Sequence, residues 1–168
     1  MSDQAVRVCR AGCNDAPAIA LVLQAAFAEY ECLYTRAAFA ATTPPTEEIV
    51  RRLGEGPTWI ALLHRTVVGT VSAVPRGEAL YVRSMAVVPD VQGRGVGRLL
   101  LERVERYADE RGFRCLDLST TPFSTSAIAL YERAGFSRSD GEPRQLCGTP
   151  LLNMRKALVL QRATAASI

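Results

Sequence analysis

Met85-Ala86-Val87-Val88-Pro89-Asp90-Val91-Gln92-Gly93-Arg94-Gly95-Val96-Gly97 is the segment with the strongest structural signal in the chain. Residues 80–88, which lead into it, are rich in β-forming residues and are stopped by the turn-forming pair Pro89-Asp90, so they predict a strand. Beyond the stretch, apolar residues recur at helical spacing as far as Gly112 and predict a half-buried helix. A glycine loop therefore joins a strand directly to a helix.

The loop has the composition of an anion-binding site. Glycines at positions 93, 95 and 97 let the backbone turn tightly and bring its N–H groups close to a ligand. The same N–H groups are unpaired donors of the following helix, whose dipole adds roughly half a positive charge at that end. A pyrophosphate is the predicted occupant, and a tight turn that binds nothing is the alternative.

Two familiar phosphate-binding motifs are excluded. Gly97 is followed by Arg98-Leu99, so the Gly-Lys-Ser/Thr sequence of the phosphate loop is missing. The glycine spacing also differs from the dinucleotide-binding motif.

A second motif occupies residues 126–136, Ser-Ala-Ile-Ala-Leu-Tyr-Glu-Arg-Ala-Gly-Phe. Its pattern is Ala-x-x-x-Tyr-x-x-x-Gly-Phe, and a predicted strand at residues 114–119 separates it from the glycine loop. Together, the Gln-x-x-Gly-x-Gly loop and this helix resemble the GNAT superfamily of N-acetyltransferases. The resemblance extends from Leu80 to Phe136, about a third of the chain.

The resemblance implies a fold of the α/β class with α+β character, the GNAT-like acyl-CoA N-acyltransferase fold. We expect a mixed, mostly antiparallel sheet with a splayed central parallel pair and about four flanking helices. The outer strands are predicted at residues 6–10, 58–64, 67–74, 146–147 and 151–156.

The early helices and the domain limits are predicted from patterning. A helix starts at Asn14 or Asp15, the pattern dissolves over residues 31–46, and a short helix runs from Thr46 to Gly54. One domain is expected over residues 1–158, with a loose tail at 159–168.

Composition limits the classes of partner. A hydrophobic content of 48% and a charged content of 22% are ordinary for a soluble globular protein, and a net charge of +3 is too small to argue for nucleic acid.

We find no signal peptide and no run of about 20 apolar residues, so we expect a cytoplasmic protein without a membrane segment. Five cysteines and one histidine show no metal-ligand spacing, which predicts reduced thiols and no metal site.

Acetyl-CoA is the cosubstrate that the resemblance implies. The loop amides would bind its pyrophosphate, with Arg94 and Arg98 either adding charge at the rim or lying solvated at the surface. By resemblance, the backbone of Val87 and Val88 pairs with the pantetheine arm, and the Val87 amide polarises the thioester carbonyl. The predicted coenzyme-binding residues are Val87, Val88, Gln92, Gly93, Arg94, Gly95, Val96, Gly97, Arg98 and Ser124.

Tyr131 is the predicted catalytic residue, as the acid that protonates the departing thiolate. A phenol with a pKa of about 10 is protonated at neutral pH and is matched to a thiol of about 8.5. A core tyrosine on the buried helix face is the alternative.

Two positions depart from the family pattern. Ser124 stands where many relatives carry an asparagine that contacts the coenzyme. The central strand has no carboxylate between Glu78 and Asp90, so the glutamate that often serves as the base is absent. Glu29, Glu31 or His64 could act as the base instead, although each also fits an ordinary surface residue. A substrate whose α-amino group has a pKa of about 8 would need little help from a base, because much of it is already unprotonated.

The predicted substrate-binding residues are Tyr81, Arg83 and Glu29. Strand alternation places Tyr81, Arg83 and Met85 on one face, and Arg83 points either to a carboxylate or phosphate on the substrate or to a surface salt bridge.

The predicted activity is transfer of acetyl from acetyl-CoA to a primary amine of a small molecule or peptide, by direct attack in a ternary complex. A non-catalytic acyl-CoA-binding module and a nucleotide-binding regulator are the rival hypotheses. Dimers are frequent in the family, so a homodimer is possible.

Overall fold

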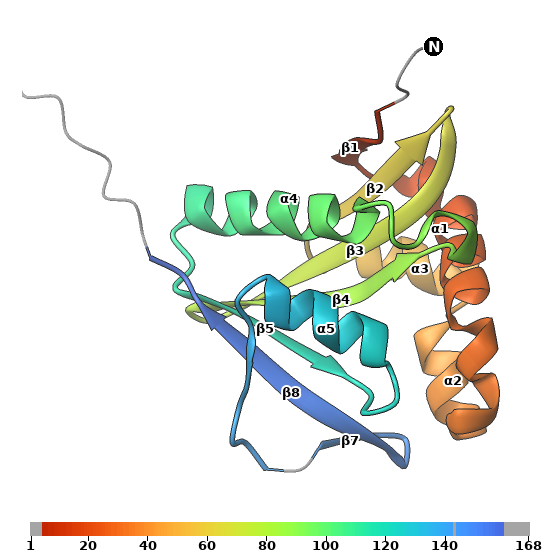
Figure 1. The fold of residues 1–168 in the computed structure, drawn as a ribbon. Helices are drawn as coiled ribbons and strands as arrows, with labels where there is room; N and C mark the ends of the chain where they lie inside the picture. Colours follow the sequence, from red (N-terminus) through yellow and green to blue (C-terminus); the bar gives the residue numbers. More distant parts are fainter. Residues whose placement is uncertain (1–4, 143, 160–168) are drawn as a thin grey trace, which may run out of the picture.

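An eight-stranded mixed sheet forms the centre of the molecule (Figure 1), and the computed structural model describes residues 5–142 and 144–159. The strand order is β1-β2-β3-β4-β5-β8-β6, and β7 pairs with β8. Only β4 and β5 run parallel; the other described pairs are antiparallel, which confirms the predicted sheet. The strands are β1 Arg7–Arg10, β2 Thr58–Leu63, β3 Thr66–Arg76, β4 Ala79–Val87, β5 Cys115–Thr120, β6 Ser137–Arg138, β7 Arg144–Leu146 and β8 Thr149–Ala157.

Helices cover both faces of the sheet. On one face α1 and α3 bury an apolar cluster against β2 and β4, and on the other α4 and α5 bury the larger core. The helices are α1 Ala16–Phe27, α2 Arg36–Thr42, α3 Thr46–Leu53, α4 Val96–Arg111 and α5 Thr125–Arg133, with 3₁₀ turns η1 Cys13–Asp15, η2 Ala28–Leu33 and η3 Pro89–Val91. The predicted strand, glycine loop and helix are confirmed, and Gly112 ends α4 in the left-handed conformation with φ 74°.

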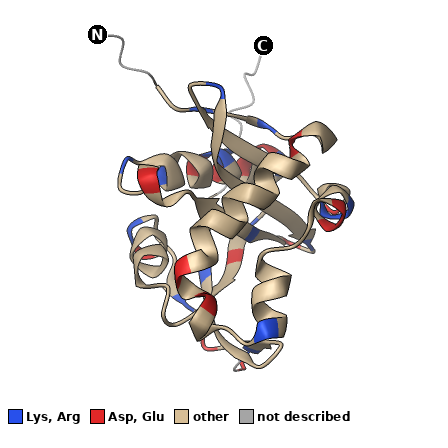
Figure 2. Cartoon of the chain, turned by 90° about the vertical axis from the view of Figure 1, so that its right-hand side faces the viewer, with Lys and Arg blue, Asp and Glu red and all other residues tan. Residues whose placement is uncertain are grey.

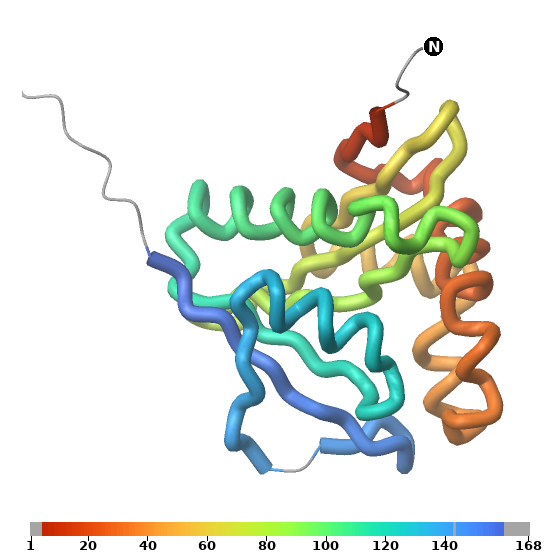
Figure 3. Tube along the Cα trace, viewed as in Figure 1, coloured from red at the N-terminus to blue at the C-terminus, as the bar shows by residue number. Residues whose placement is uncertain are grey.

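The segment from residue 31 to 46 contains a helix that the sequence analysis did not predict. Thr35 caps α2 by accepting a hydrogen bond from the Ala38 amide at 3.1 Å. Its hydroxyl also donates to the Cys147 carbonyl at 2.7 Å, and its N–H donates to Thr149 Oγ1 at 2.9 Å. These bonds join α2 to the β7–β8 hairpin at one end of the molecule (Figure 3). Because the partners are more than 100 residues apart in the sequence, no local pattern predicts them.

The N-terminal helical run corrects one sequence-based expectation. Residues Cys13–Leu33 form a continuous helical segment of 21 residues with a mean hydropathy of 1.3, which meets the length and composition of a membrane span. The same test is passed by core helices of soluble proteins, and here Ile19, Val22 and Leu23 pack in the core. The expectation that no segment is long and apolar enough is therefore wrong. The predicted tail, from residue 160 onward, lies outside the described residues.

The central strands part in the middle of the sheet. Residues of β4 and β5 pair only from Ala79↔Cys115 to Val82↔Leu118. Immediately beyond, Ser84 has φ 52°, and the register with β3 shifts between Ser72↔Arg83 and Thr70↔Ala86, so that β4 carries a bulge. The bulge bends β4 away from β5, and the two strands diverge (Figure 1), as the predicted splay requires.

Candidate active site

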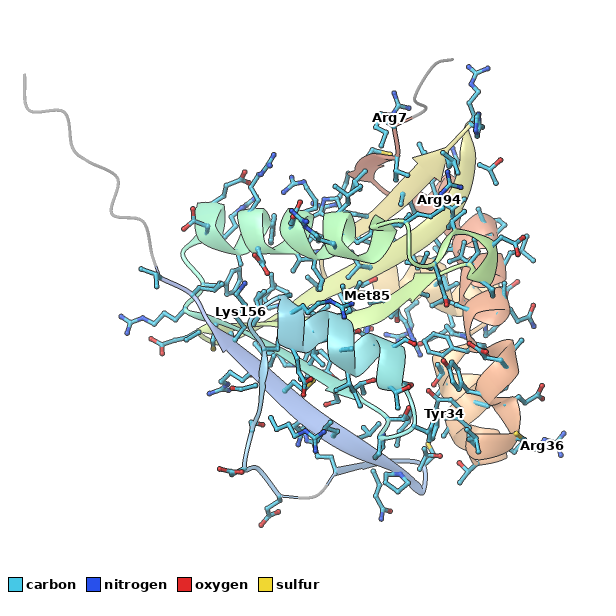
Figure 4. All side chains as sticks on the ribbon, in the orientation of Figure 1. Arg7, Tyr34, Arg36, Met85, Arg94 and Lys156 are labelled. Atoms are coloured by element: carbon cyan, nitrogen blue, oxygen red, sulfur yellow. The ribbon has the colours of Figure 1, made fainter. Side chains whose placement is uncertain are left out.

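A cleft of about 270 Å³ opens where β4 and β5 diverge. Its walls come from β4, β5, α5, the end of α1, α2 and the β7–β8 hairpin. Met85 of β4 and Tyr34, just before α2, lie on its walls and are labelled in Figure 4. The loop after β4 brings the predicted anion site to the same part of the fold.

The backbone amides of the glycine loop are uncommitted. Within the described chain, Leu99 donates the first backbone hydrogen bond of α4, to the Gly95 carbonyl at 3.1 Å, and the amides of residues 93–98 donate to no backbone carbonyl. Gly93 and Gly95 have φ of 77° and 80°, and a β-carbon at either would meet nothing within 4 Å. The loop therefore presents several donors, the α4 dipole and open space together, which suits an anion.

Gly97 serves a different purpose from the other two glycines. A β-carbon at this residue would lie 2.9 Å from Leu130 Cδ2 and 3.3 Å from Met85 Cε. A β-carbon here would require the ends of the Leu130 and Met85 side chains to move. This contact fixes the glycine loop relative to the cleft.

The two valines at the end of β4 differ in their free backbone groups. Val88 donates its N–H to the Val68 carbonyl at 2.9 Å and accepts from the Val91 amide at 3.2 Å, so its backbone has no unpaired N–H to offer a ligand. Since neighbouring residues of a strand direct their backbone groups to opposite sides, Val87 directs its own away from β3 and toward the side of β4 on which β5 lies. Gln92 donates its side-chain amide to the Val87 carbonyl at 2.9 Å, which positions the loop entrance.

Tyr131 lies on α5 and lines the cleft with 7% of its surface exposed. Burial, followed by the nearby Tyr81 and Tyr34 phenols, raises the pKa of its phenol above the ordinary value. The phenol thus keeps its proton across the physiological range. The ring also packs against Phe136 with centroids 5.8 Å apart, as the core alternative predicts, and the catalytic role stays a prediction.

Ser124 is buried at the start of α5 and also lines the cleft. Its hydroxyl shares a hydrogen bond of 2.7 Å with the Thr121 hydroxyl. A hydroxyl has one donor and two acceptor sites, so this pair leaves capacity for a ligand.

The candidates for a general base do not meet in the cleft. Glu29 and Glu31 are exposed on η2, and His64 is exposed with φ 49° in the β2–β3 turn. Among the described residues, no Asp, Glu or His lines the cleft. The side chains there that can carry charge are Tyr34, Tyr81, Tyr131, Arg52 and Arg83.

The predicted common face of Tyr81, Arg83 and Met85 is wrong for Met85. Because Ser84 and Met85 together lie opposite Val71 in the bulge, the alternation of β4 is interrupted there. Met85 joins the core on the α4 side, whereas Arg83 reaches Glu55 just after α3. The Arg83–Glu55 ion pair is part-buried at the cleft wall instead of lying at the surface. Contact of Arg83 with a substrate anion stays a prediction.

The remaining predicted arginines lie at the surface. Arg98 is largely exposed and pairs with Glu102 at 2.7 Å, and Arg94 is exposed on the loop (Figure 4). In the side view of Figure 2, basic and acidic residues are both scattered, with no continuous basic face on that side. In the described ranges, no group of three or more His, Cys, Asp or Glu residues could hold a metal ion.

Sequence reasoning missed one wall of the cleft. Tyr34 is at the centre of an aromatic group, with ring centroids 5.1 Å from Phe123, 6.1 Å from Phe39 and 6.5 Å from Phe27. Burial raises the pKa of the Tyr34 phenol. The density of aromatic residues between positions 27 and 39 was the available signal, but only the fold brings Phe123 to them.

Comparison with known proteins gives a family match over residues 22–136, to the family described as Acetyltransferase (GNAT) family. The probable N-acetyltransferase camello of Xenopus laevis is 37% identical over 84 residues, which are 48% of this chain and 38% of that protein. The aligned part thus spans well under half of that relative. The uncharacterised N-acetyltransferase YjgM of Escherichia coli is 29% identical over 133 residues, covering 76% of this chain and 79% of its own length.

A solved structure matches almost the whole chain. The PaiA N-acetyltransferase of Thermoplasma acidophilum, in complex with coenzyme A, has a TM-score of 0.79 with 13% sequence identity, over 92% of this chain and 99% of that one. At this identity the likeness shows the shared fold.

Proposed function

The chain belongs to the GNAT family of acetyltransferases, and from that premise we propose that it transfers an acetyl group from acetyl-CoA to a primary amine of a small molecule or peptide. The transfer takes place by direct attack in a ternary complex, without a covalent enzyme intermediate. The structural relative that was solved with coenzyme A supports this choice of cosubstrate.

One observation carries the proposal: the uncommitted amides of residues 93–98 lie at the N-terminus of α4, beside the cleft that Tyr131 lines. A diphosphate held by these amides would direct the coenzyme arm into the gap between β4 and β5. There the thioester end of the extended arm can meet the Val87 N–H, which β3 does not use, whereas the Val87 carbonyl already accepts from Gln92.

Different residues at the site have different roles in the reaction. The amine nitrogen attacks the thioester carbonyl carbon, and the Val87 amide stabilises the negative charge that develops on the oxygen. When the tetrahedral intermediate collapses, the C–S bond breaks and the thiolate takes the proton of the Tyr131 phenol. The phenolate then recovers a proton from the acetylated nitrogen or from water.

The amine must arrive unprotonated, because the described lining of the cleft has no carboxylate or histidine. The same lack of a base is the observation that supports the rival function, a binding module without catalysis.

Calorimetry and a thiol-release assay together test the proposal. We expect acetyl-CoA to bind, ATP to bind far more weakly, and coenzyme A to be released in the presence of suitable amines. Binding without turnover on any amine, with no change in Tyr131→Phe, would establish the binding module. Preferential binding of ATP would point to a nucleotide-dependent regulator instead.

A further inference from the structure

Arg83 has an unusual set of partners for a buried guanidinium. Its Nη1 donates to Glu55 Oε2 at 2.6 Å, and the side chain, 24% exposed, lines the cleft. Its Nε and Nη2 are buried and find no acceptor in the described part of the chain. Buried donors without acceptors are costly, so a partner for these two is expected in the functional state.

The two unpartnered atoms are the pair that arginines elsewhere in this protein use to hold a carboxylate. Arg155 binds Asp117 through Nε at 2.6 Å and Nη2 at 2.8 Å. Arg51 binds Glu48 through Nε at 2.8 Å and Nη2 at 2.7 Å. Nε and Nη2 form one edge of the planar group, and their parallel N–H bonds match the two oxygens of a carboxylate. The same edge of Arg83 therefore fits a carboxylate.

The charges around Arg83 leave a place for one more anion. The guanidinium groups of Arg51, Arg52 and Arg83 share the carboxylates of Glu48 and Glu55. One positive charge of this network is therefore uncompensated. Arg51 is exposed to solvent, whereas Arg52 and Arg83 both line the cleft.

We propose that the acceptor amine carries a carboxylate, which binds side-on to Arg83; this assignment of substrate class rests on the proposed acetyl transfer. Both donor atoms are covered by neighbouring groups, so the guanidinium rotates slightly to meet the ligand while Glu55 holds Nη1. The resulting pair of charge-assisted hydrogen bonds fixes both the position and the orientation of the acceptor.

The volume of the cleft limits the size of the acceptor. It is about 270 Å³, and the acyl end of the coenzyme has to share it. Phe27, Leu146 and Leu151 add apolar surface to the cleft. A small amino acid with an apolar or aromatic side chain fits these limits.

Matched pairs of acceptors test the carboxylate. L-Leucine, L-methionine and L-phenylalanine are each compared with their primary amides in the thiol-release assay, and their binding to the protein loaded with coenzyme A is measured by calorimetry. The amides have the less basic amine and contain more of the unprotonated form, so a preference for the acids cannot come from the amine. We expect the acids to have the lower KM and the tighter binding.

The Arg83→Gln variant connects that preference to the proposed contact. We expect the KM for the acids to rise about 10- to 100-fold, as expected for lost charge-assisted hydrogen bonds. The KM for the amides and for acetyl-CoA should stay unchanged, which also reports that the variant is folded. Arg155→Gln is the matched control, because it removes a side-on ion pair of the same kind outside the cleft and should leave every KM unchanged.

Other results separate this inference from the proposed function. Three results would overturn the carboxylate site while acetyl transfer stands. The enzyme could use acids and amides equally well, or Arg83→Gln could weaken the use of both equally. The third is acetylation of O-phosphoethanolamine faster than that of any acid. Tighter binding of the acids without turnover would support the carboxylate site and reject the transfer. If neither acids nor amides bind or react, the carboxylate site is also rejected, and acetyl-CoA binding then reports separately on the coenzyme site.

Discussion

Leu130 of α5 lies so close to Gly97 of α4 that a β-carbon at residue 97 would be 2.9 Å from its Cδ2 atom. We therefore expect Gly97→Ala to push the Leu130 side chain aside and to displace the start of α4 slightly, which weakens acetyl-CoA binding and costs about 1 kcal/mol in the free energy of unfolding. Urea denaturation measures this cost. The double variant with Leu130→Ala removes the obstructing atom, so it should recover the coenzyme affinity that Gly97→Ala loses; a single variant with normal affinity would contradict the contact.

Gly95 has φ 80° and open space around it, so Gly95→Ala introduces backbone strain and a methyl group at the anion site. We expect a loss of roughly 1 kcal/mol in stability. Calorimetry should also show weaker binding of acetyl-CoA. Gly112→Ala is the matched control, with φ 74°, equally open space and a position at the far end of α4. It should lose comparable stability but keep its affinity, and an equal loss of affinity in both would argue against the loop as the site.

Removing the phenol hydroxyl tests the role of Tyr131. We expect Tyr131→Phe to lower kcat on the order of 10²-fold, the usual contribution of a general acid, with the KM for acetyl-CoA little changed. The pH profile adds a second readout. Because burial raises the pKa of Tyr131, the wild-type rate should rise as the amine deprotonates and should not fall again near pH 10, about where an unburied tyrosine would lose its proton. A falling limb below that pH would exclude this acid.

Glu48 provides a pH-dependent contribution to stability. Hydrogen bonds from Arg51 and then Arg52 lower the pKa of its carboxyl from 4.5 to about 2. Because the carboxyl has a lower pKa in the folded state, its ion pairs stabilise the fold fully at any pH above the pKa of the unfolded state. This stabilisation is lost as the pH falls through the pKa of the folded state. The difference in urea midpoint between wild type and Glu48→Gln should thus be largest above pH 4.5 and shrink toward pH 2.

Glu47→Gln is the control for that comparison. It removes the same charge from the exposed neighbouring position, which has no salt bridge among the residues that the structure describes. A constant difference between wild type and Glu48→Gln across this range would show that the ion pairs contribute nothing in solution.

The elements with strong local signals could be predicted from the sequence. The strand before Pro89, the left-handed glycines at 93 and 95 and the end of α4 at Gly112 depend on backbone preferences that each residue carries with it. The motif around Tyr131 has a fixed spacing, so the sequence also predicts the helix that brings this residue to the cleft. These features form the coenzyme half of the candidate site.

The acceptor half depends on contacts between distant segments. Helix α2 is short, and its capping residue Thr35 is held by Cys147 and Thr149, which no window around residue 35 contains. The bulge at Ser84 reverses the alternation on which the placement of Met85 depended. A serine gives no local signal for a φ of 52°, so the error could not be seen in the sequence.

The early end of the β4–β5 ladder at Val82 has one more consequence. Sheets usually leave unsatisfied hydrogen-bonding edges at their borders, where a neighbouring molecule can attach and start aggregation. Here two such edges face each other inside the fold, with α5 and the β7–β8 hairpin beside them. A slender organic arm in this gap would find backbone hydrogen-bonding groups on either side, while the surrounding elements would keep another polypeptide sheet away from the same edges.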